Sequence, residues 1–221
     1  MEILVVAPHP DDETLGCGGA LLRHVQAGDK INWMIVTSVS EQQGYSEEWI
    51  KKREKEIETV FSLYGFSSLY KIGVPACSLG GDERQGLVTE INRVIKQSSA
   101  EIIYLPYPGD IHTDHRAVFD AAASASKWFR APGVRKILCY EVLSETEISI
   151  DPAVQGFRPN VFVDISEQLE RKIEIMKIFN GEAGVFPFPR SEEAIRALAA
   201  YRGASSGFRA AEAFMLLRER R

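Results

Sequence analysis

The stretch Val5-Val6-Ala7-Pro8-His9-Pro10-Asp11-Asp12-Glu13 places one imidazole and three carboxylates directly after an apolar run. The run Leu4–Ala7 is short and ends at a proline, as is typical of a buried strand in a parallel sheet. Polar side chains after such a strand lie at the carboxyl end of the sheet, where open α/β folds bind their ligands. Each proline fixes its own φ and restricts the residue before it. The stretch therefore predicts a preorganised site at the edge of an α/β sheet.

The same stretch indicates a metal site. His9 and Asp12 offer a nitrogen and an oxygen, which are ligands that zinc takes in proteins, and ferrous iron suits them too. A second polar group, Gly109-Asp110-Ile111-His112-Thr113-Asp114-His115, follows the predicted strand Glu101–Leu105 and opens a predicted helix. One of its two histidines is expected to complete a His/Asp/His triad. Capping or surface histidines are the alternative, which is less favoured because two of only four histidines fall in this loop.

The rest of the chain alternates predicted strands and helices. This order predicts a Rossmann-like three-layer α/β sandwich with a mostly parallel sheet. Further strands are expected at Ile31–Thr37, Tyr70–Val74, Lys136–Val142 and Val161–Ile165, and helices at 20–25, 46–64, 87–96, from a Ser166 cap to Phe179, and 191–201. Three other segments are expected to be a glycine-rich loop at 16–19, a loop lining the site at Ser78–Gly86, and a lid or partner surface at 181–190. His24 is expected to be solvated, and the chain to end in a short helix or strand.

Length and composition favour one domain that acts on small molecules. The chain has 221 residues, of which 45% are hydrophobic, as in an ordinary packed core. Its formal net charge of −5 argues against nucleic acid or an anionic membrane as partner. No apolar stretch approaches the roughly 20 residues of a membrane span, and no signal peptide is recognisable, so a cytoplasmic protein is expected. The three cysteines lack CxxC spacing and are expected to be reduced.

The two polar groups together resemble the LmbE-like, or PIG-L, family of zinc-dependent N-acetylglucosamine deacetylases. The resemblance rests on Pro8-His9-Pro10-Asp11-Asp12-Glu13 followed by His112-Thr113-Asp114-His115. It extends over most of the chain through Arg53-Glu54-Lys55-Glu56, Val163-Asp164-Ile165-Ser166, Tyr201-Arg202-Gly203 and Ala211-Glu212-Ala213-Phe214. It implies one domain over residues 1–221, with a core at about 1–145 and a part at 146–221 that contributes to the substrate mouth or an oligomer contact.

The resemblance also implies roles for individual residues. Its metal ligands fall on His9, Asp12 and His115, and its general base falls on Asp11. A zinc ion so held lowers the pKa of water toward about 7 and polarises an amide carbonyl. Asp11 then takes the proton of the water and passes it to the leaving amine.

Other residues are expected to assist. His112, the non-ligand histidine, donates to the oxyanion of the tetrahedral intermediate, which is typically worth ~3–4 kcal/mol. Asp114 orients His112 or a neighbouring ligand, and Glu13 orients ligands from behind. The expected substrate contacts are Arg53, Asp110 and Arg202.

Two departures from the family pattern bear on the substrate. Asp110 stands two residues before His112, where some relatives in thiol-cofactor pathways carry a tyrosine before the histidine segment. Asn180-Gly181-Glu182 replaces a Ser-Gln pair that many relatives carry. These changes predict an altered substrate mouth or oligomer contact, and the aromatic segment Val185–Pro189 favours a homo-oligomer.

The leading hypothesis is a metal-dependent hydrolase that removes acetyl from an N-acetylglucosamine-type small molecule. The same chemistry on another acyl-amine is one alternative, with a nucleotide-linked sugar, an antibiotic aminosugar, a thiol-cofactor precursor and a chitooligosaccharide all open. A sugar- or metabolite-binding protein with a relict site is another, although every ligand and base position is filled. A dinucleotide-dependent dehydrogenase is excluded, because acids stand where a pyrophosphate needs glycines and backbone N–H groups.

Overall fold

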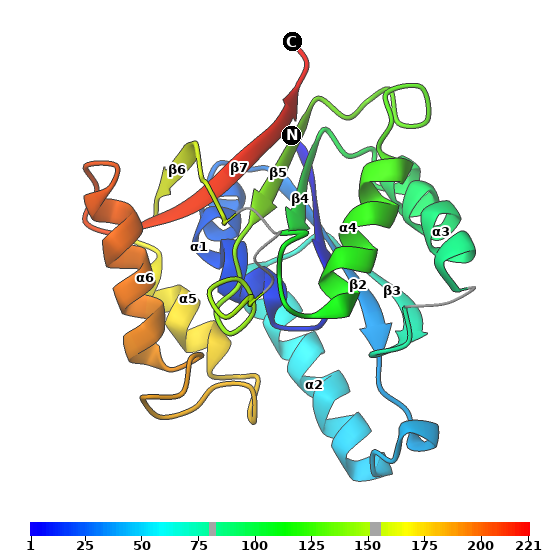
Figure 1. Ribbon diagram of the computed structural model, residues 1–221, viewed down its shortest axis with the longest axis horizontal. Helices are drawn as coiled ribbons and strands as arrows, with labels where there is room; N and C mark the ends of the chain where they lie inside the picture. Colours follow the sequence, from blue (N-terminus) through cyan, green and yellow to red (C-terminus); the bar gives the residue numbers. More distant parts are fainter. Residues whose placement is uncertain (80–82, 151–155) are drawn as a thin grey trace.

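The computed structural model describes residues 1–79, 83–150 and 156–221, which form one sheet with helices on both faces (Figure 1). The sheet has seven strands in the order β3-β2-β1-β4-β5-β7-β6. All neighbouring strands are parallel except that β7 runs antiparallel to β5 and β6. The strands are β1 Glu2–Ala7, β2 Lys30–Ser38, β3 Ser68–Pro75, β4 Ile102–Pro106, β5 Lys136–Tyr140, β6 Val161–Asp164 and β7 Ala211–Glu219. The predicted three-layer α/β fold is confirmed.

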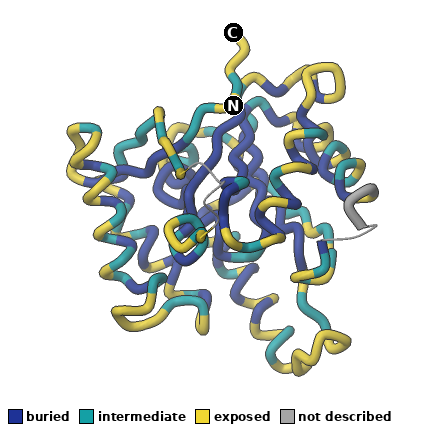
Figure 2. The backbone as a smooth tube through the Cα atoms, viewed as in Figure 1, coloured by how far each residue is buried: buried dark blue, intermediate teal, exposed yellow. Residues whose placement is uncertain are grey.

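The helices divide the core into two layers. Alternate residues of β1 explain its unbroken apolar run, because Val5 packs with one layer of helices and Val6 with the other. Helices α1, α2, α5 and α6 cover the first face, and α3 and α4 cover the second. The helices are α1 Asp12–Gln26, α2 Glu47–Tyr64, α3 Glu83–Gln97, α4 Thr113–Ala125, α5 Leu169–Met176 and α6 Glu192–Ala204, and a short 3₁₀ turn, η1, spans Glu41–Gln43. Figure 2 shows the central strands buried, whereas the first two residues of α2, Glu47 and Glu48, are exposed.

The expected glycine-rich loop at 16–19 is wrong, because these residues belong to α1. The helix starts at Asp12 and continues through a kink at Cys17, whose φ is −144° and whose side chain is buried. The glycines allow close packing rather than a loop. A Cβ on Gly16 would lie 2.2 Å from the ring of Tyr140, and one on Gly19 would lie 2.6 Å from Ile165.

A buried ion pair from the end of the chain supports this kinked helix. Glu212 accepts hydrogen bonds from the backbone N–H groups of Gly19 and Ala20, each at 2.8 Å. Lys172 donates to the carbonyl of Leu15 at 2.8 Å and lies 2.7 Å from Glu212. Because burying a charge requires a partner, the two side chains stabilise each other while they satisfy backbone groups that the kink leaves free. Strand β7 and helix α5 therefore help to hold the helix on which the predicted site begins.

Other predictions are confirmed with shifted boundaries or need correction. Helix α2 begins one residue after its predicted start, with Ser46 as its N-cap, and the end of the chain forms strand β7. Helix α5 begins at Leu169, because the Ser166 hydroxyl bonds Asp164 instead of capping a helix. His24 is not solvated, since its ring lies 2.7 Å from Asp29 and 3.0 Å from the hydroxyl of Tyr104.

The predicted loop at Ser78–Gly86 is only partly open to comparison. Its residues 80–82 lie outside the described residues, and α3 begins at Glu83, earlier than the predicted start at 87. In the described ranges, no helix combines the length and the apolar character needed to cross a membrane. The expected homo-oligomer stays a prediction.

Candidate active site

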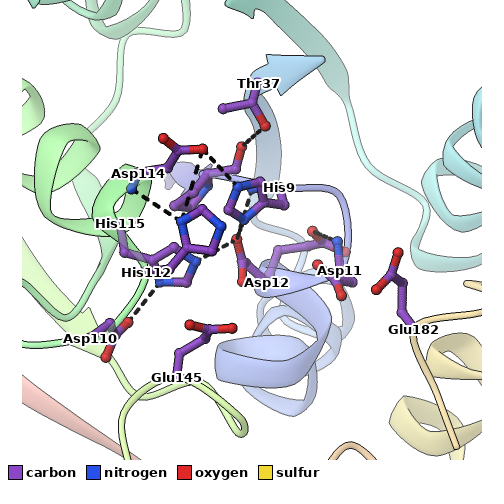
Figure 3. A network of polar contacts seen from close by, with 12 residues as sticks. His9, Asp11, Asp12, Thr37, Asp110, His112, Asp114, His115, Glu145 and Glu182 are labelled. Carbon is purple, nitrogen blue, oxygen red and sulfur yellow. Dashed lines mark hydrogen bonds and ion pairs between the residues drawn. The ribbon is translucent and has the colours of Figure 1, made fainter. Parts of the chain in front are cut away.

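The ends of β1 and β4 bring the two polar groups together at the carboxyl edge of the sheet (Figure 3). His9 follows β1, and Asp12 is the first residue of α1. His112 is the N-cap of α4, and His115 lies in its first turn. The ring centroid of His9 lies 4.4 Å from that of His112 and 5.4 Å from that of His115. Residues about a hundred positions apart in the chain thus form one cluster.

His9, Asp12 and His115 have the geometry of a metal-binding set. The Nε2 of His9 lies 3.1 Å from Asp114, and its Nδ1 lies 3.3 Å from Oδ2 of Asp12. The Nδ1 of His115 lies 2.8 Å from Asp110, and its Nε2 lies 3.3 Å from the same Asp12 oxygen. Each ring thus gives one nitrogen to a supporting carboxylate and turns the other toward Asp12, as metal-ligating histidines do. His115 Nε2 is buried without a hydrogen-bond partner among the described residues, and this orphaned nitrogen fits a divalent ion.

The electrostatics of His9, Asp12 and His115 favour a positive charge between these three side chains. Although burial works against protonation, hydrogen bonds to Asp114 and Asp12 raise the pKa of His9 to about 9. Burial also disfavours protonated His115, but Asp12 and Asp110 hold the pKa of this ring well above its usual range. The two rings and Asp12 therefore need either protons or a metal ion between them.

A second cluster, His9 with His112 and Asp114, shares one histidine with the first. In this cluster Nε2 of His9 already faces the Asp114 carboxylate, and Nδ1 of His112 accepts the backbone N–H of Asp114 at 3.1 Å. The first set keeps a free nitrogen on each ring. The geometry of the first set therefore suits a metal ion better than that of the second.

The bond to the Asp114 backbone also decides the tautomer of His112. Since Nδ1 accepts a hydrogen bond, the proton of the neutral ring sits on Nε2. Burial, with His9 and His115 beside it, lowers the pKa of His112 to about 4, so the ring is neutral near pH 7. The side chain lines the same cavity as His9. His112 thus presents one N–H donor beside the metal set.

Asp114 supports both histidines. Its Oδ2 lies 3.1 Å from Nε2 of His9 and accepts the backbone N–H of Cys77 at 2.8 Å. Its own backbone N–H engages His112. The carboxyl is buried. The structure thus places Asp114 behind the site, where it orients the two rings.

Asp11 lies beside the metal set without belonging to it. Its backbone has a φ of 143°, a conformation that is rare outside glycine, and its side chain does not cap α1. The buried carboxyl lines the cavity. Burial, followed by the charges of Asp12 and Glu182, raises the pKa of Asp11 above its usual range. A buried carboxyl with a raised pKa beside a metal set is a candidate for a proton-transfer group.

Glu13 supports the backbone of Asp11 rather than a metal ligand directly. It is fully buried, and its carboxyl accepts the Asp11 N–H at 3.2 Å and the Thr14 hydroxyl at 2.6 Å. Burial raises the pKa of Glu13 to about 7. The residue therefore helps to hold the unusual turn on which Asp11 sits.

Two of the three predicted substrate contacts lie elsewhere. Among the described residues, the lining of the 280 Å³ cavity includes Arg53 but neither Asp110 nor Arg202. Arg202 is bound to Glu141 through two contacts of 2.7 and 2.6 Å. Asp110 is buried behind His115 and accepts the hydroxyl of Thr146 at 2.6 Å. Asp110 is thus positioned to orient a metal ligand rather than to touch a substrate.

This placement of Asp110 gives a testable prediction. Asp110→Ala removes the acceptor that orients His115, so we expect zinc affinity to fall by about 10–100-fold, as for other supporting residues of metal sites. Asp110→Asn keeps an acceptor oxygen, so its zinc affinity should lie between that of Asp110→Ala and that of the wild type. Competition with a chromophoric chelator measures the affinity. An unchanged affinity with a raised KM would instead restore the substrate-binding role expected from the sequence.

Arg53 keeps its predicted place at the cavity. Its Nη2 contacts Glu182, its Nε lies 3.5 Å from Glu56, and its Nη1 is buried with no partner among the described residues. Glu182 also pairs with Arg190 at 3.1 Å, so the 181–190 segment forms part of the cavity wall. An unpaired guanidinium N–H in a cavity is a donor for a ligand oxygen.

Several residues that line the cavity were not predicted from the sequence. Glu145 follows β5 and points toward the imidazoles in Figure 3, while burial raises the pKa of this carboxyl. Because Glu145 follows a parallel strand, its position in the sequence could have identified it as a candidate site residue. Arg190 comes from an irregular segment, and no periodicity indicates which of its side chains face inward. Tyr45 and Trp49 also line the cavity.

The chain is similar to several known proteins. A family model for PIG-L, described as GlcNAc-PI de-N-acetylase, matches residues 4–126. Diacetylchitobiose deacetylase of Thermococcus kodakarensis is 25% identical, with 96% of this chain and 81% of the relative aligned. A probable N-acetyl-α-D-glucosaminyl L-malate deacetylase of Bacillus anthracis is 24% identical over 79% of this chain and 78% of the relative. The solved 4-carboxy-2-hydroxymuconate hydratase of Pseudomonas putida shares the fold, with a TM-score of 0.77, 17% identity, and coverage of 100% and 98%. Because this fold also carries a hydratase, the reaction must be argued from the site.

Proposed function

Because the chain belongs to the PIG-L family, we propose that it is a metal-dependent amide hydrolase that removes the acetyl group from an N-acetylglucosamine-type sugar. One observation carries the proposal. Two imidazole nitrogens converge on Asp12, and an unbound carboxyl, Asp11, and an N–H donor, His112, line the same cavity. These are the parts that amide hydrolysis by activated water requires.

His9, Asp12 and His115 would hold the metal, with zinc as our first choice and ferrous iron as the alternative. A divalent ion in this set supplies Lewis acidity, which makes water more acidic and the acetamide carbonyl more electrophilic. Asp114 and Asp110 hold the two imidazoles with their free nitrogens toward Asp12.

Asp11 transfers the proton, and His112 stabilises the developing negative charge. Asp11 takes a proton from the attacking water and delivers it to the nitrogen of the leaving amine. His112 donates its Nε2–H to the carbonyl oxygen as negative charge develops there. Arg53 offers its unpaired Nη1–H to an oxygen of the bound sugar. The products are acetate and the free amino sugar.

We also propose that residues 1–221 work as one domain. Strand β7 inserts between β5 and β6 in the common sheet, and Glu182 and Arg190 reach the cavity. These observations support a contribution of the part after residue 145 to the substrate mouth.

Acetate release tests the proposed function. Protein stripped of metal should release no acetate from N-acetylglucosamine or its glycosides, and added zinc or ferrous iron should restore release. The substrate that gives the highest kcat/KM identifies the preferred conjugate. Protein with one bound metal ion that releases acetate from none of these sugars contradicts the proposal.

A further inference from the structure

The cavity extends beyond the metal set along one helix. We propose that its outer end is a second binding subsite, formed by Tyr45 and Trp49, for an uncharged ring attached to the N-acetylated sugar. This inference rests on the proposed function and specifies its substrate: a neutral disaccharide or comparable glycoside, rather than a free monosaccharide or an anionic conjugate.

Helix α2 supplies the length of the subsite. Trp49, Arg53 and Ile57 follow one another at intervals of four residues and all line the cavity. Eight residues of α-helix at ~1.5 Å each separate Trp49 from Ile57 by about 12 Å. Ile57 is buried, whereas Trp49 is half-buried in the first turn of α2, which extends past the carboxyl edge of the sheet (Figure 1). The wall therefore runs from the interior to the rim and is longer than one sugar ring.

Two aromatic rings form the rim. The side chain of Tyr45 is 39% exposed, and its ring centroid lies 4.7 Å from that of Trp49. The guanidinium of Arg53 lies 5.0 Å from the centre of the Trp49 ring. The C–H groups on one face of a pyranose pack against such rings, while its hydroxyls stay available for hydrogen bonds. Tyr45 and Trp49 thus offer an apolar surface at the point where a second ring of the substrate leaves the cavity.

The charges of the cavity favour a neutral ring. Its described lining holds five carboxylates and three cationic side chains, a formal charge of −2 that a divalent ion brings to zero. Each cation already contacts a carboxylate: Lys71 contacts Glu54, and both arginines contact Glu182, although Nη1 of Arg53 keeps an N–H without a partner among the described residues. A carboxylate or phosphate on the substrate would face these acids and compete with them for the same cations. The carboxylates are Asp11, Asp12, Glu54, Glu145 and Glu182, and the cationic side chains are Arg53, Lys71 and Arg190.

A purely structural role for Tyr45 makes a different prediction. Tyr45 precedes the N-cap Ser46, where an apolar residue stabilises a helix by packing against the fourth helical residue. In that case Tyr45→Ala lowers the melting temperature and affects all substrates equally. A ring-binding role affects only substrates that possess the second ring.

The experiment compares three substrates with the zinc-loaded protein: N-acetylglucosamine, N,N′-diacetylchitobiose and an N-acetylglucosaminyl malate. We expect the kcat/KM of the neutral disaccharide to exceed the other two at least tenfold in the wild type. Tyr45→Ala should lower the ratio of disaccharide to monosaccharide kcat/KM about tenfold, mainly through KM, because it removes a stacking surface. Tyr45→Phe keeps the ring and should retain the ratio. Trp128→Ala, which removes an aromatic ring that is 63% exposed and does not line the cavity, is the control.

The outcomes separate the two proposals. Acetate release from none of the substrates contradicts the proposed function itself. Equal kcat/KM for monosaccharide and disaccharide, a preference for the malate conjugate, or an equal loss on all substrates in Tyr45→Ala each overturns the subsite while the hydrolase stands. A selective loss in Tyr45→Ala that Tyr45→Phe does not show supports it.

Discussion

Asp11→Asn lowers kcat of the zinc-loaded protein by about 10³-fold in our account, and it leaves metal content and KM close to the wild type. Asparagine matches aspartate in size and tolerates a positive φ. The backbone φ of 143° at residue 11 and the hydrogen bond from its backbone N–H to Glu13 should therefore persist. The amide cannot accept the proton of the attacking water. Only the chemical step is affected.

Steady-state acetate release and the zinc content per chain check this prediction together. Glu48→Gln is the matched control, because it makes the same chemical change on the exposed surface of α2. Activity of Asp11→Asn within about threefold of the wild type would show that another group is the base.

Asp12→Asn should produce the opposite pattern, in which metal and activity are lost together. Asp12 Oδ2 is the point on which both ring nitrogens converge at 3.3 Å. An amide keeps an acceptor for the backbone N–H of His9 but carries no charge and ligates a divalent ion poorly. We expect zinc affinity to fall by at least about 100-fold, and activity at limiting zinc to fall with it.

Thermal unfolding distinguishes the two variants without an activity assay. A ligand that binds only the folded protein raises its melting temperature. Zinc should therefore stabilise the wild type and Asp11→Asn, and it should leave Asp12→Asn nearly unchanged at the same concentration. Equal stabilisation of all three proteins would remove Asp12 from the metal set.

The parts of the fold and site that follow strands were predictable from the sequence. An apolar run bounded by proline indicates a buried parallel strand, and its carboxyl end is where ligands bind. That logic led from β1 and β4 to His9, Asp12 and the 112–115 group, which lie together in the structure. The choice of His115 over His112 as a ligand came from the family resemblance, and it stays a prediction that is consistent with the geometry, in which Nε2 of His115 lies 3.3 Å from Asp12 while Nδ1 of His112 bonds the Asp114 backbone.

The predictions that differ from the structure concern features that depend on packing between distant segments of the chain. Glycines at 16–19 suggested a loop, but the positions allow a helix to pack closely on Tyr140 and Ile165, which no local pattern reveals. Asp110 lies among site residues in sequence, yet its burial behind His115 gives it a supporting position. Arg202 meets Glu141, a partner 61 residues away. Glu182 and Arg190 reach the cavity from a segment without periodicity, so their positions required the folded chain.

Anomalous diffraction from crystals grown with zinc, recorded at the zinc absorption edge, tests the central claim most directly. We expect one strong peak at about 2.0–2.2 Å from Nδ1 of His9, Oδ2 of Asp12 and Nε2 of His115. A peak bound by His9, His112 and Asp114 instead, or zinc bound away from these residues, would contradict it.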